Sequence, residues 1–293
     1  MLNIPYKIMT ELPLPTASIG SYGTKEQISQ TNNNSRFYIS SITDKGNFKE
    51  ENQDNLLIKY GETAFGHCVL LVVADGVGGL QCGEIASRLA VEKLNDWWNI
   101  IFKSIAFSAF NNIENHISAS INAAVTDINI EIDKWGKKIN CKMGTTLSVL
   151  FVMGHWYCIK HVGDSRIYIL SHRLQQLTED DNLLNQYLKS GTGIESFERY
   201  TALVNTLTKC VGVKTEIELF EQTGTFEEAD SFMLCTDGLY KHIKNKEIHK
   251  CVYKCSRNAR KSQVYLRQIV CKARNRGESD DISAIILTGS KGL

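Results

Sequence analysis

Four short acidic turns next to apolar segments constrain this chain more than any other feature. They are Asn52-Gln53-Asp54, Asp75-Gly76-Val77-Gly78-Gly79, Thr236-Asp237-Gly238 and Ser279-Asp280-Asp281. Asp75 and Asp237 each follow an apolar run, and Asp280 precedes one. Strand ends lie side by side in a sheet, so we expect these carboxylates to converge. Converged carboxylates repel one another unless a cation lies between them, and oxygen ligands of this kind suit Mg²⁺ or Mn²⁺ better than Zn²⁺.

Glycine follows two of these aspartates. Gly76 and Gly238 allow the backbone to turn sharply, and Gly76 would let its own carbonyl face the same cation as Asp75. A single Asp-Gly pair is usually an ordinary turn. Several aspartates at the ends of buried strands instead favour a metal site.

The hydrophobic pattern predicts strands separated by two groups of helices. The predicted strands are Phe37–Ile42, Leu56–Lys59, His67–Ala74, Thr145–Val152, Trp156–Val162, Arg166–Leu170, Ile217–Gln222, Phe232–Cys235 and Ile282–Leu287. Helical spacing predicts helices over Gly83–Trp98, about Asn112–Lys134 and within Leu239–Arg274. The tight turn Gly163-Asp164-Ser165 predicts a hairpin between the two strands that flank it. Hairpin-linked strands favour antiparallel sheets with helices outside, an α+β fold.

The two least periodic stretches lie at the N-terminus and in the second half of the chain. Residues 1–35 hold all three prolines and a polar run, and they are predicted to be a loosely ordered tail. One domain is predicted over residues 36–293. Residues 180–209 are polar and weakly periodic, and are predicted to be a mobile insertion with a short helix.

Composition excludes several classes of partner. The net charge is +1, so global charge gives no argument for nucleic acid or an anionic membrane. No apolar segment reaches the roughly 20 residues that a membrane-spanning helix needs, and the N-terminus lacks the apolar core of a signal peptide. The nine cysteines include no C-x-x-C pair and are interpreted as buried free thiols in a reducing compartment. We therefore expect a cytoplasmic protein, and separately expect it to be a monomer.

The motifs, in this order, resemble the PPM/PP2C family of metal-dependent serine/threonine protein phosphatases, in its bacterial form. The matching segments are Gly46-x-x-Lys49-x-x-Asn52-Gln53-Asp54, Asp75-Gly76-Val77-Gly78-Gly79, Gly144-Thr145-Thr146, Val162-Gly163-Asp164-Ser165-Arg166, Leu177-Thr178, Cys235-Thr236-Asp237-Gly238-Leu239 and Asp280-Asp281-Ile282-Ser283. Each is short, but the seven together run from about residue 44 to 288.

This resemblance implies a four-layer α/β/β/α sandwich with two Mn²⁺ or Mg²⁺ ions at one end. By position, Asp75 would bridge both metals and the Gly76 carbonyl would bind one. Asp237 and Asp280 would bind the other, and Asp54 would hold metal-bound waters or a metal directly. The position of Asp164 implies a third, weaker metal.

The implied reaction is hydrolysis of phosphoserine or phosphothreonine on another protein by a metal-activated water, without a phosphoenzyme. A cognate Ser/Thr kinase, or the targets of that kinase, would be the natural partners. Two alternatives remain: a phosphatase of a small phosphorylated molecule, and a catalytically weak module that binds a phosphoprotein. The basic stretches Lys241–Lys250 and Arg257–Arg276 favour solvated helices over nucleic acid binding, although they would also suit an acidic phosphopeptide.

Among the residues that depart from the family pattern, three bear on the binding of phosphate and metal. Lys49 stands where an arginine usually grips the substrate phosphate, and lysine lacks the planar fork of arginine. Gln53 replaces a glutamate and removes a negative charge, while Asp281 replaces an asparagine and adds one nearby. We therefore expect weaker binding of phosphate and of one metal, with the reaction retained.

Overall fold

Two antiparallel sheets form the centre of the molecule. The computed structural model describes residues 28–29, 37–63, 65–77, 80, 82–102, 104, 112–191 and 197–289. The first sheet has the order β1 (Ile28–Ser29), β2 (Phe37–Asp44), β11 (Ile282–Gly289), β10 (Ser231–Cys235), β7 (Arg166–Leu170) and β8 (Leu174–Gln176). The second has the order β3 (Asp54–Thr63), β4 (Gly66–Asp75), β5 (Leu147–Met153), β6 (Trp156–Val162) and β9 (Phe220–Thr225).

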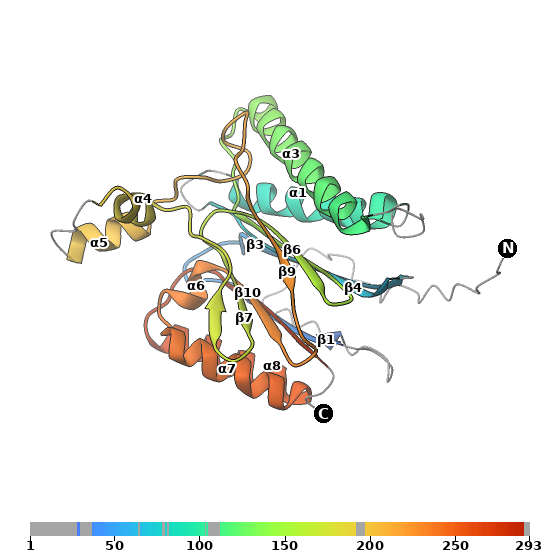
Figure 1. Ribbon diagram of the computed structural model, residues 1–293. Helices are drawn as coiled ribbons and strands as arrows, with labels where there is room; N and C mark the ends of the chain where they lie inside the picture. The colour runs from blue at the N-terminus through green and yellow to red at the C-terminus, as the bar shows by residue number, and fades with distance from the viewer. Residues whose placement is uncertain are drawn as a thin grey trace.

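Helices cover the outer face of each sheet, which confirms the predicted α/β/β/α sandwich (Figure 1). The second sheet is covered by α1 (Gly83–Asp96), its π-helical continuation Trp97–Phe102, and α3 (Ile113–Ile139). The first sheet is covered by α7 (Asn245–Arg257) and α8 (Ser262–Asn275), which a short 3₁₀ turn, Ala259–Lys261, connects.

Three apolar layers alternate with the sheets and helices, and β4 shows why. Its even-numbered residues Leu70 and Val72 pack with the residues of α1 and α3. Its odd-numbered residues Leu71 and Val73 pack between the two sheets. Successive side chains of a strand point to opposite faces, so a strand covered on both faces must be apolar throughout.

The predicted hairpin at residues 163–165 is wrong. β6 pairs with β5 and β9 in the second sheet, whereas β7 pairs with β10 and β8 in the first. Both strands are almost entirely buried, so each takes an interior place in its own sheet. The short turn therefore carries the chain across the sandwich, where facing sheets lie roughly 10 Å apart.

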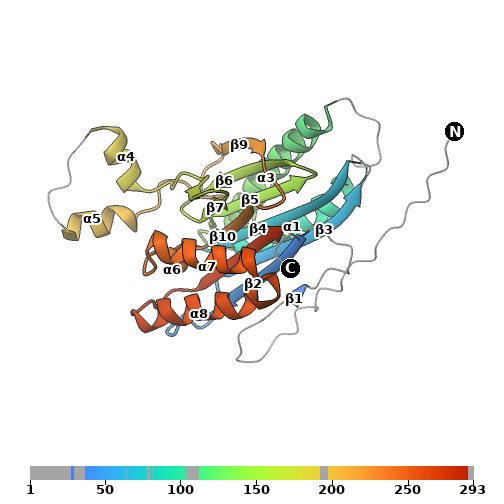
Figure 2. The same cartoon turned by 60° about the horizontal axis from the view of Figure 1, so that its bottom comes forward.

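Two further expectations need correction or fall outside the described residues. The insertion contains two helices, α4 (Leu183–Lys189) and α5 (Phe197–Val204), where one was expected. They project from the body of the sandwich (Figure 2).

Of the predicted tail, the structure describes only Ile28–Ser29, which pair with β2. Gly78 and Gly79 also lie outside the described residues. None of the helices in the described ranges is both long enough and apolar enough to cross a membrane.

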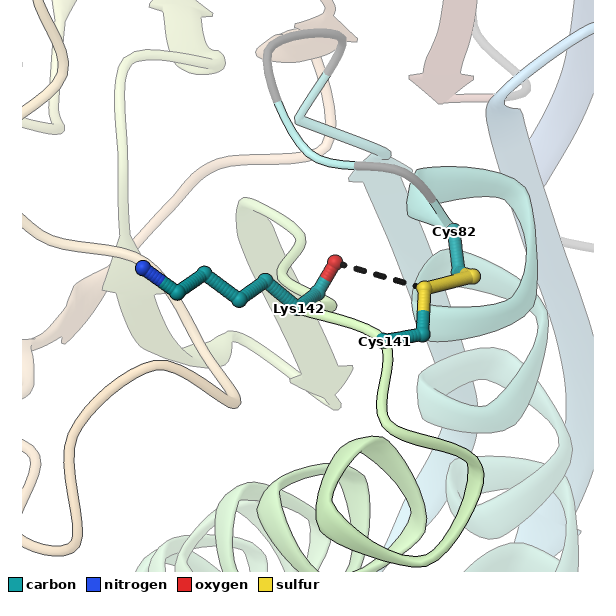
Figure 3. The surroundings of a disulfide bond; sticks show 3 residues. All are labelled: Cys82, Cys141 and Lys142. Carbon is teal, nitrogen blue, oxygen red and sulfur yellow. Dashed lines mark hydrogen bonds between the residues drawn. A yellow bond between two sulfur atoms is a disulfide. The ribbon is translucent and has the colours of Figure 1, made fainter.

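A disulfide joins Cys82 and Cys141, so the expectation of free thiols is wrong for these two (Figure 3). The bond links the residue before α1 to the segment that follows α3, across 59 residues of sequence. Packing of α1 on α3 brings the two cysteines together, which no local spacing could indicate. Cys271 is exposed, whereas five free thiols are buried as expected: Cys68, Cys158, Cys235, Cys251 and Cys255. The pairing weakens the argument for a reducing compartment that rested on free thiols.

Candidate active site

The predicted aspartates lie at one end of the sandwich, at or next to strand ends. Asp54 is the first residue of β3 and pairs directly with Asp75, the last residue of β4. Asp237 opens the one-turn helix α6 (Asp237–Tyr240) after β10, and Asp280 precedes β11, the partner of β10. Asp164 lies in the turn between β6 and β7. The two sheets thus each contribute carboxylates to this end.

Thr236 ties the two sheets together inside the acidic cluster. Its hydroxyl donates a hydrogen bond of 3.0 Å to Oδ2 of Asp54, and it accepts one of 2.9 Å from the backbone N–H of Ser283. Asp54 belongs to one sheet, and Thr236 follows a strand of the other. The bond therefore fixes the separation of the sheets at the aspartates. The sequence shows Thr236 only as a neighbour of Asp237.

Burial and mutual repulsion make these carboxylates hard to ionise. Burial, followed by the charge of Asp281, raises the pKa of Asp54 to about 8. Burial, followed by the charge of Asp237, raises the pKa of Asp164 to about 8. Burial also raises the pKa of Asp75 well above its ordinary value, with Asp54 the strongest of the neighbouring charges. A cation among these groups would favour their charged forms.

The donor set fits a hard divalent cation. Asp54 and Asp237 each have a buried Oδ1 atom without a hydrogen-bond partner in the described part of the chain. Buried polar atoms are normally satisfied, so such oxygens are candidates for metal ligands. Among the described residues, however, no three acidic, histidine or cysteine side chains lie close enough together to hold a metal ion as they stand. The case for a cation therefore rests on the two unpartnered oxygens and on the mutual repulsion of the buried carboxylates.

Two lysines balance charge within the cluster. Lys49 forms ion pairs with Asp280 and with Oδ2 of Asp281, the latter at 3.0 Å. Lys241 forms an ion pair with Asp237. Burial acts to lower the pKa of Lys49, but the hydrogen bond and charge of Asp280, together with Asp281, raise it above its ordinary value. Lys49 therefore carries its positive charge next to a predicted metal ligand.

Asp281 organises the loop that carries Lys49, a role that sequence reasoning missed. Its side chain is buried, with Oδ1 accepting a hydrogen bond of 2.8 Å from the backbone N–H of Gly46. Its Oδ2 accepts one of 2.9 Å from the N–H of Gln53. The extra charge that Asp281 brings to this position thus fixes both ends of the 46–53 loop. Lys49 also donates to Oε1 of Gln53 at 3.3 Å.

The turn that carries Asp164 is held by residues from the following segment. Asp181 Oδ2 accepts a hydrogen bond of 3.0 Å from the N–H of Gly163, and the N–H of Asp181 donates one of 2.7 Å to the Gly163 carbonyl. Nε2 of His161 lies 3.0 Å from the same carbonyl. Burial lowers the pKa of His161, so a neutral ring donates from Nε2. Asp181 and His161 therefore position Asp164.

An aromatic and ionic stack supports the other side of the same turn. Arg166 is paired with Asp180, with Nη2 2.6 Å from Oδ2, and its guanidinium lies 3.5 Å from the ring centroid of Tyr240. The Tyr240 hydroxyl donates a hydrogen bond of 2.8 Å to the Asp164 carbonyl. Arginine suits this role because its planar group pairs with carboxylates and stacks on rings. The sequence indicated Arg166 as part of a motif but gave no sign of Tyr240.

The predicted motif Gly144-Thr145-Thr146 holds the backbone at Asp75. The Thr146 hydroxyl accepts a hydrogen bond of 3.0 Å from the Asp75 N–H, and the Thr145 hydroxyl donates one of 2.9 Å to its carbonyl. Gly76 is needed for close packing, since a Cβ there would lie 2.4 Å from the Gly83 backbone. The start of α1 therefore packs against the residue after Asp75.

The family model and the relatives that match this chain all point to one protein family. The family model for protein phosphatase 2C matches residues 48–270. A serine/threonine phosphatase, stp, from Listeria monocytogenes is 28% identical over 250 residues, 84% of this chain and 93% of that protein. The protein phosphatase PhpP of Streptococcus pneumoniae is 29% identical over 255 residues, 85% of this chain and 96% of that protein.

Solved structures agree with the sandwich described above. The S. agalactiae serine/threonine phosphatase superposes with a TM-score of 0.71 at 27% identity, covering 86% of this chain and 99% of that one. The catalytic domain of the phosphatase PstP, solved with two manganese ions, shares the fold with a TM-score of 0.69 at 21% identity, over 87% and 98% of the two chains. The family model, the relatives and the fold all agree: this chain belongs to the protein phosphatase 2C family.

Proposed function

We propose that this chain hydrolyses phosphoserine and phosphothreonine on proteins, with Mn²⁺ or Mg²⁺ as cofactor. One observation carries the proposal: aspartates from both sheets converge at one end of the sandwich, and two of them keep a buried carboxylate oxygen without a partner. The named relatives from Listeria and Streptococcus, which are matched over most of their length, support a protein phosphatase.

The metal-holding residues in this proposal are those that the motifs indicated. Asp75 would hold both ions, the Gly76 carbonyl would bind one, and Asp237 and Asp280 would bind the other. Asp54 would bind directly or through water. Asp164 would bind a third metal ion more weakly. When bound, the ions supply Lewis-acid chemistry, which makes a water nucleophilic at neutral pH and offsets charge on the phosphate.

Lys49 is the proposed contact for the substrate phosphate. Its ammonium group lies at the rim of the acidic cluster, where Asp281 and Gln53 restrain it. A lysine offers one point charge, so it can hold a single phosphate oxygen without the bidentate grip of arginine. We therefore propose a site in which phosphate binding is weak and most stabilisation comes from the carboxylate-held cations.

The finer parts of the proposal concern partners and location. We propose that the enzyme is a cytoplasmic monomer that acts on the targets of a cognate Ser/Thr kinase. A pure phosphoprotein-binding module would not need four converging aspartates, and the protein phosphatases to which the chain is similar favour protein over small-molecule substrates.

Hydrolysis of an aryl phosphate with Mn²⁺, with Mg²⁺ and with a chelator tests the proposal. We expect turnover with at least one of the two metals and none with the chelator. If the folded protein hydrolysed no aryl phosphate with either metal, the proposed phosphatase activity would be wrong. Phosphopeptides assayed beside a panel of phosphorylated metabolites then distinguish the two substrate classes.

A further inference from the structure

A groove leads away from the acidic cluster along the start of α7. Its first part has a volume of about 390 Å³ and begins at Lys49 and Asp280. Its second part has a volume of about 550 Å³ and lies between the α6–α7 connection and the end of α8. Both parts are lined by Lys241 and His242, so they adjoin. The groove is thus continuous with the site where phosphate is proposed to bind.

The two parts of the groove differ in charge. The first contains two acidic side chains: Asp280 pairs with Lys49, whereas Oε2 of Glu278, 3.5 Å from Nε2 of His242, is buried without a hydrogen-bond partner in the described part of the chain. The second is lined by basic side chains and by no acidic ones. Its lining residues are Tyr240, Lys241, His242, Ile243, Lys244, Asn245 and Arg276.

Within the second part, Lys244 is the cation best placed to meet a ligand. It is exposed and precedes α7, whereas Arg276 is already held by Glu247, with Nη1 2.7 Å from Oε2. Lys241 is held by Asp237. A negative group in this cavity would therefore meet Lys244 first, while Lys241 and Arg276 are each already paired with a carboxylate.

An exposed aromatic ring lies at the start of the groove. Phe48 lines the first part and has 90% of its surface exposed. A single exposed apolar side chain is ordinary on a protein surface, so Phe48 marks the start of the groove and no more. Phe48 also directly precedes Lys49, so a chain segment that binds there would pass the proposed phosphate contact.

We propose that the second part of the groove binds an acidic side chain of the substrate protein, close in sequence to the phosphorylated residue. The phosphatase would then prefer phosphopeptides with acidic flanks, through charge complementarity centred on Lys244. This inference rests on the proposed function, since it needs a phosphorylated protein at the acidic cluster. It names a substrate class that the motif residues alone do not.

Matched phosphopeptides with glutamate or lysine at the three positions on each side of the phosphoresidue test this proposal. For the wild type we expect kcat/KM at least fivefold higher for the acidic peptide. Lys244→Glu should remove or reverse that preference. Lys250→Glu is the matched control: it makes the same charge change at an exposed position of α7 outside the groove, and should keep the preference.

Hydrolysis of an aryl phosphate, which has no flanking residues, separates this proposal from the proposed function. Lys244→Glu should leave that rate within twofold of wild type. Equal kcat/KM for the two wild-type peptides, or a preference that survives Lys244→Glu, would overturn the groove assignment while aryl phosphate hydrolysis persists. If the wild-type protein hydrolysed no aryl phosphate, the proposed phosphatase activity itself would be wrong.

Discussion

At the scale of single residues, Asp237 combines the features expected of a metal ligand. It is buried, one of its oxygens is unpartnered, and the other is paired with Lys241. Asp237→Asn keeps the shape but removes the negative charge that would hold a cation. We expect kcat/KM for an aryl phosphate to fall at least tenfold, which is about 1.4 kcal/mol of barrier.

The control for this variant is Asp127→Asn, the same chemical change at an exposed position on α3. It should retain the wild-type rate. If Asp237→Asn were as active as Asp127→Asn under saturating Mn²⁺, the site would have to lie elsewhere.

Lys49 allows a second test at the same scale. Lys49→Arg restores the planar donor that matches phosphate geometry, so the KM for an aryl phosphate should fall severalfold. The neighbouring carboxylates Asp280 and Asp281 can also pair with arginine, so the loop should stay in place. Lys250→Arg, at an exposed position, should leave KM unchanged. A higher KM for Lys49→Arg would contradict the role given to this position.

Residue roles could be predicted only where a motif marks them. The aspartates follow from their positions at strand ends, since local sequence sets both the strand and its end. Asp281 was recognised as an added charge, but its role is to hold the N–H groups of Gly46 and Gln53. Those bonds join segments more than 220 residues apart, and such contacts leave no local signal.

At the scale of elements, the bounds of some strands were predictable, although β3 is longer and β9 lies three residues later than predicted, and sheet membership was not predictable. The predicted ranges of β6 and β7 match the structure, yet the two strands lie in different sheets. Alternation of polar and apolar residues shows which face of a strand is buried, and a strand buried on both faces lacks it. A short turn then fits either a hairpin or a crossing between sheets. The crossing is what places Asp164 at the active end.

The disulfide between Cys82 and Cys141 gives a prediction for α1 and α3. It closes a loop of 59 residues in the unfolded chain, and such links typically stabilise by about 2–4 kcal/mol. A dithiol reductant, or the double change Cys82→Ser and Cys141→Ser, should therefore lower the free energy of unfolding by roughly that amount. Denaturant titration followed by circular dichroism measures it.

The exposed free thiol Cys271 supplies the control for this measurement. Cys271→Ser should unfold at the wild-type midpoint and remain sensitive to the reductant. An unchanged midpoint for the double variant, or the same number of free thiols with and without reductant, would show that the bond does not form in solution.

At the scale of the whole molecule, the sandwich concentrates negative charge at one end. The connections between the sheets at that end include residues 45–53 and 163–165, and both of these carry site residues. The folded pKa of Asp54 is about 8, against an ordinary value of 3.8, so the folded state binds more protons than the unfolded state between these values. Stability due to this group therefore falls as pH rises from about 4 to about 8.

A bound cation should offset this loss, because it binds the folded cluster and has no equivalent site in the unfolded chain. At a concentration 100 times its dissociation constant, it would add about 2.7 kcal/mol to the free energy of unfolding, or about 5 °C in Tm. Thermal unfolding at pH 7.5 with Mn²⁺, with Mg²⁺ and with a chelator measures this shift without any substrate. The double variant Asp75→Asn and Asp237→Asn should lose most of it. If the cation shifted the Tm of that variant by the same amount, it would have to bind outside the acidic cluster. The aspartates that converge from the two sheets would then not be its ligands.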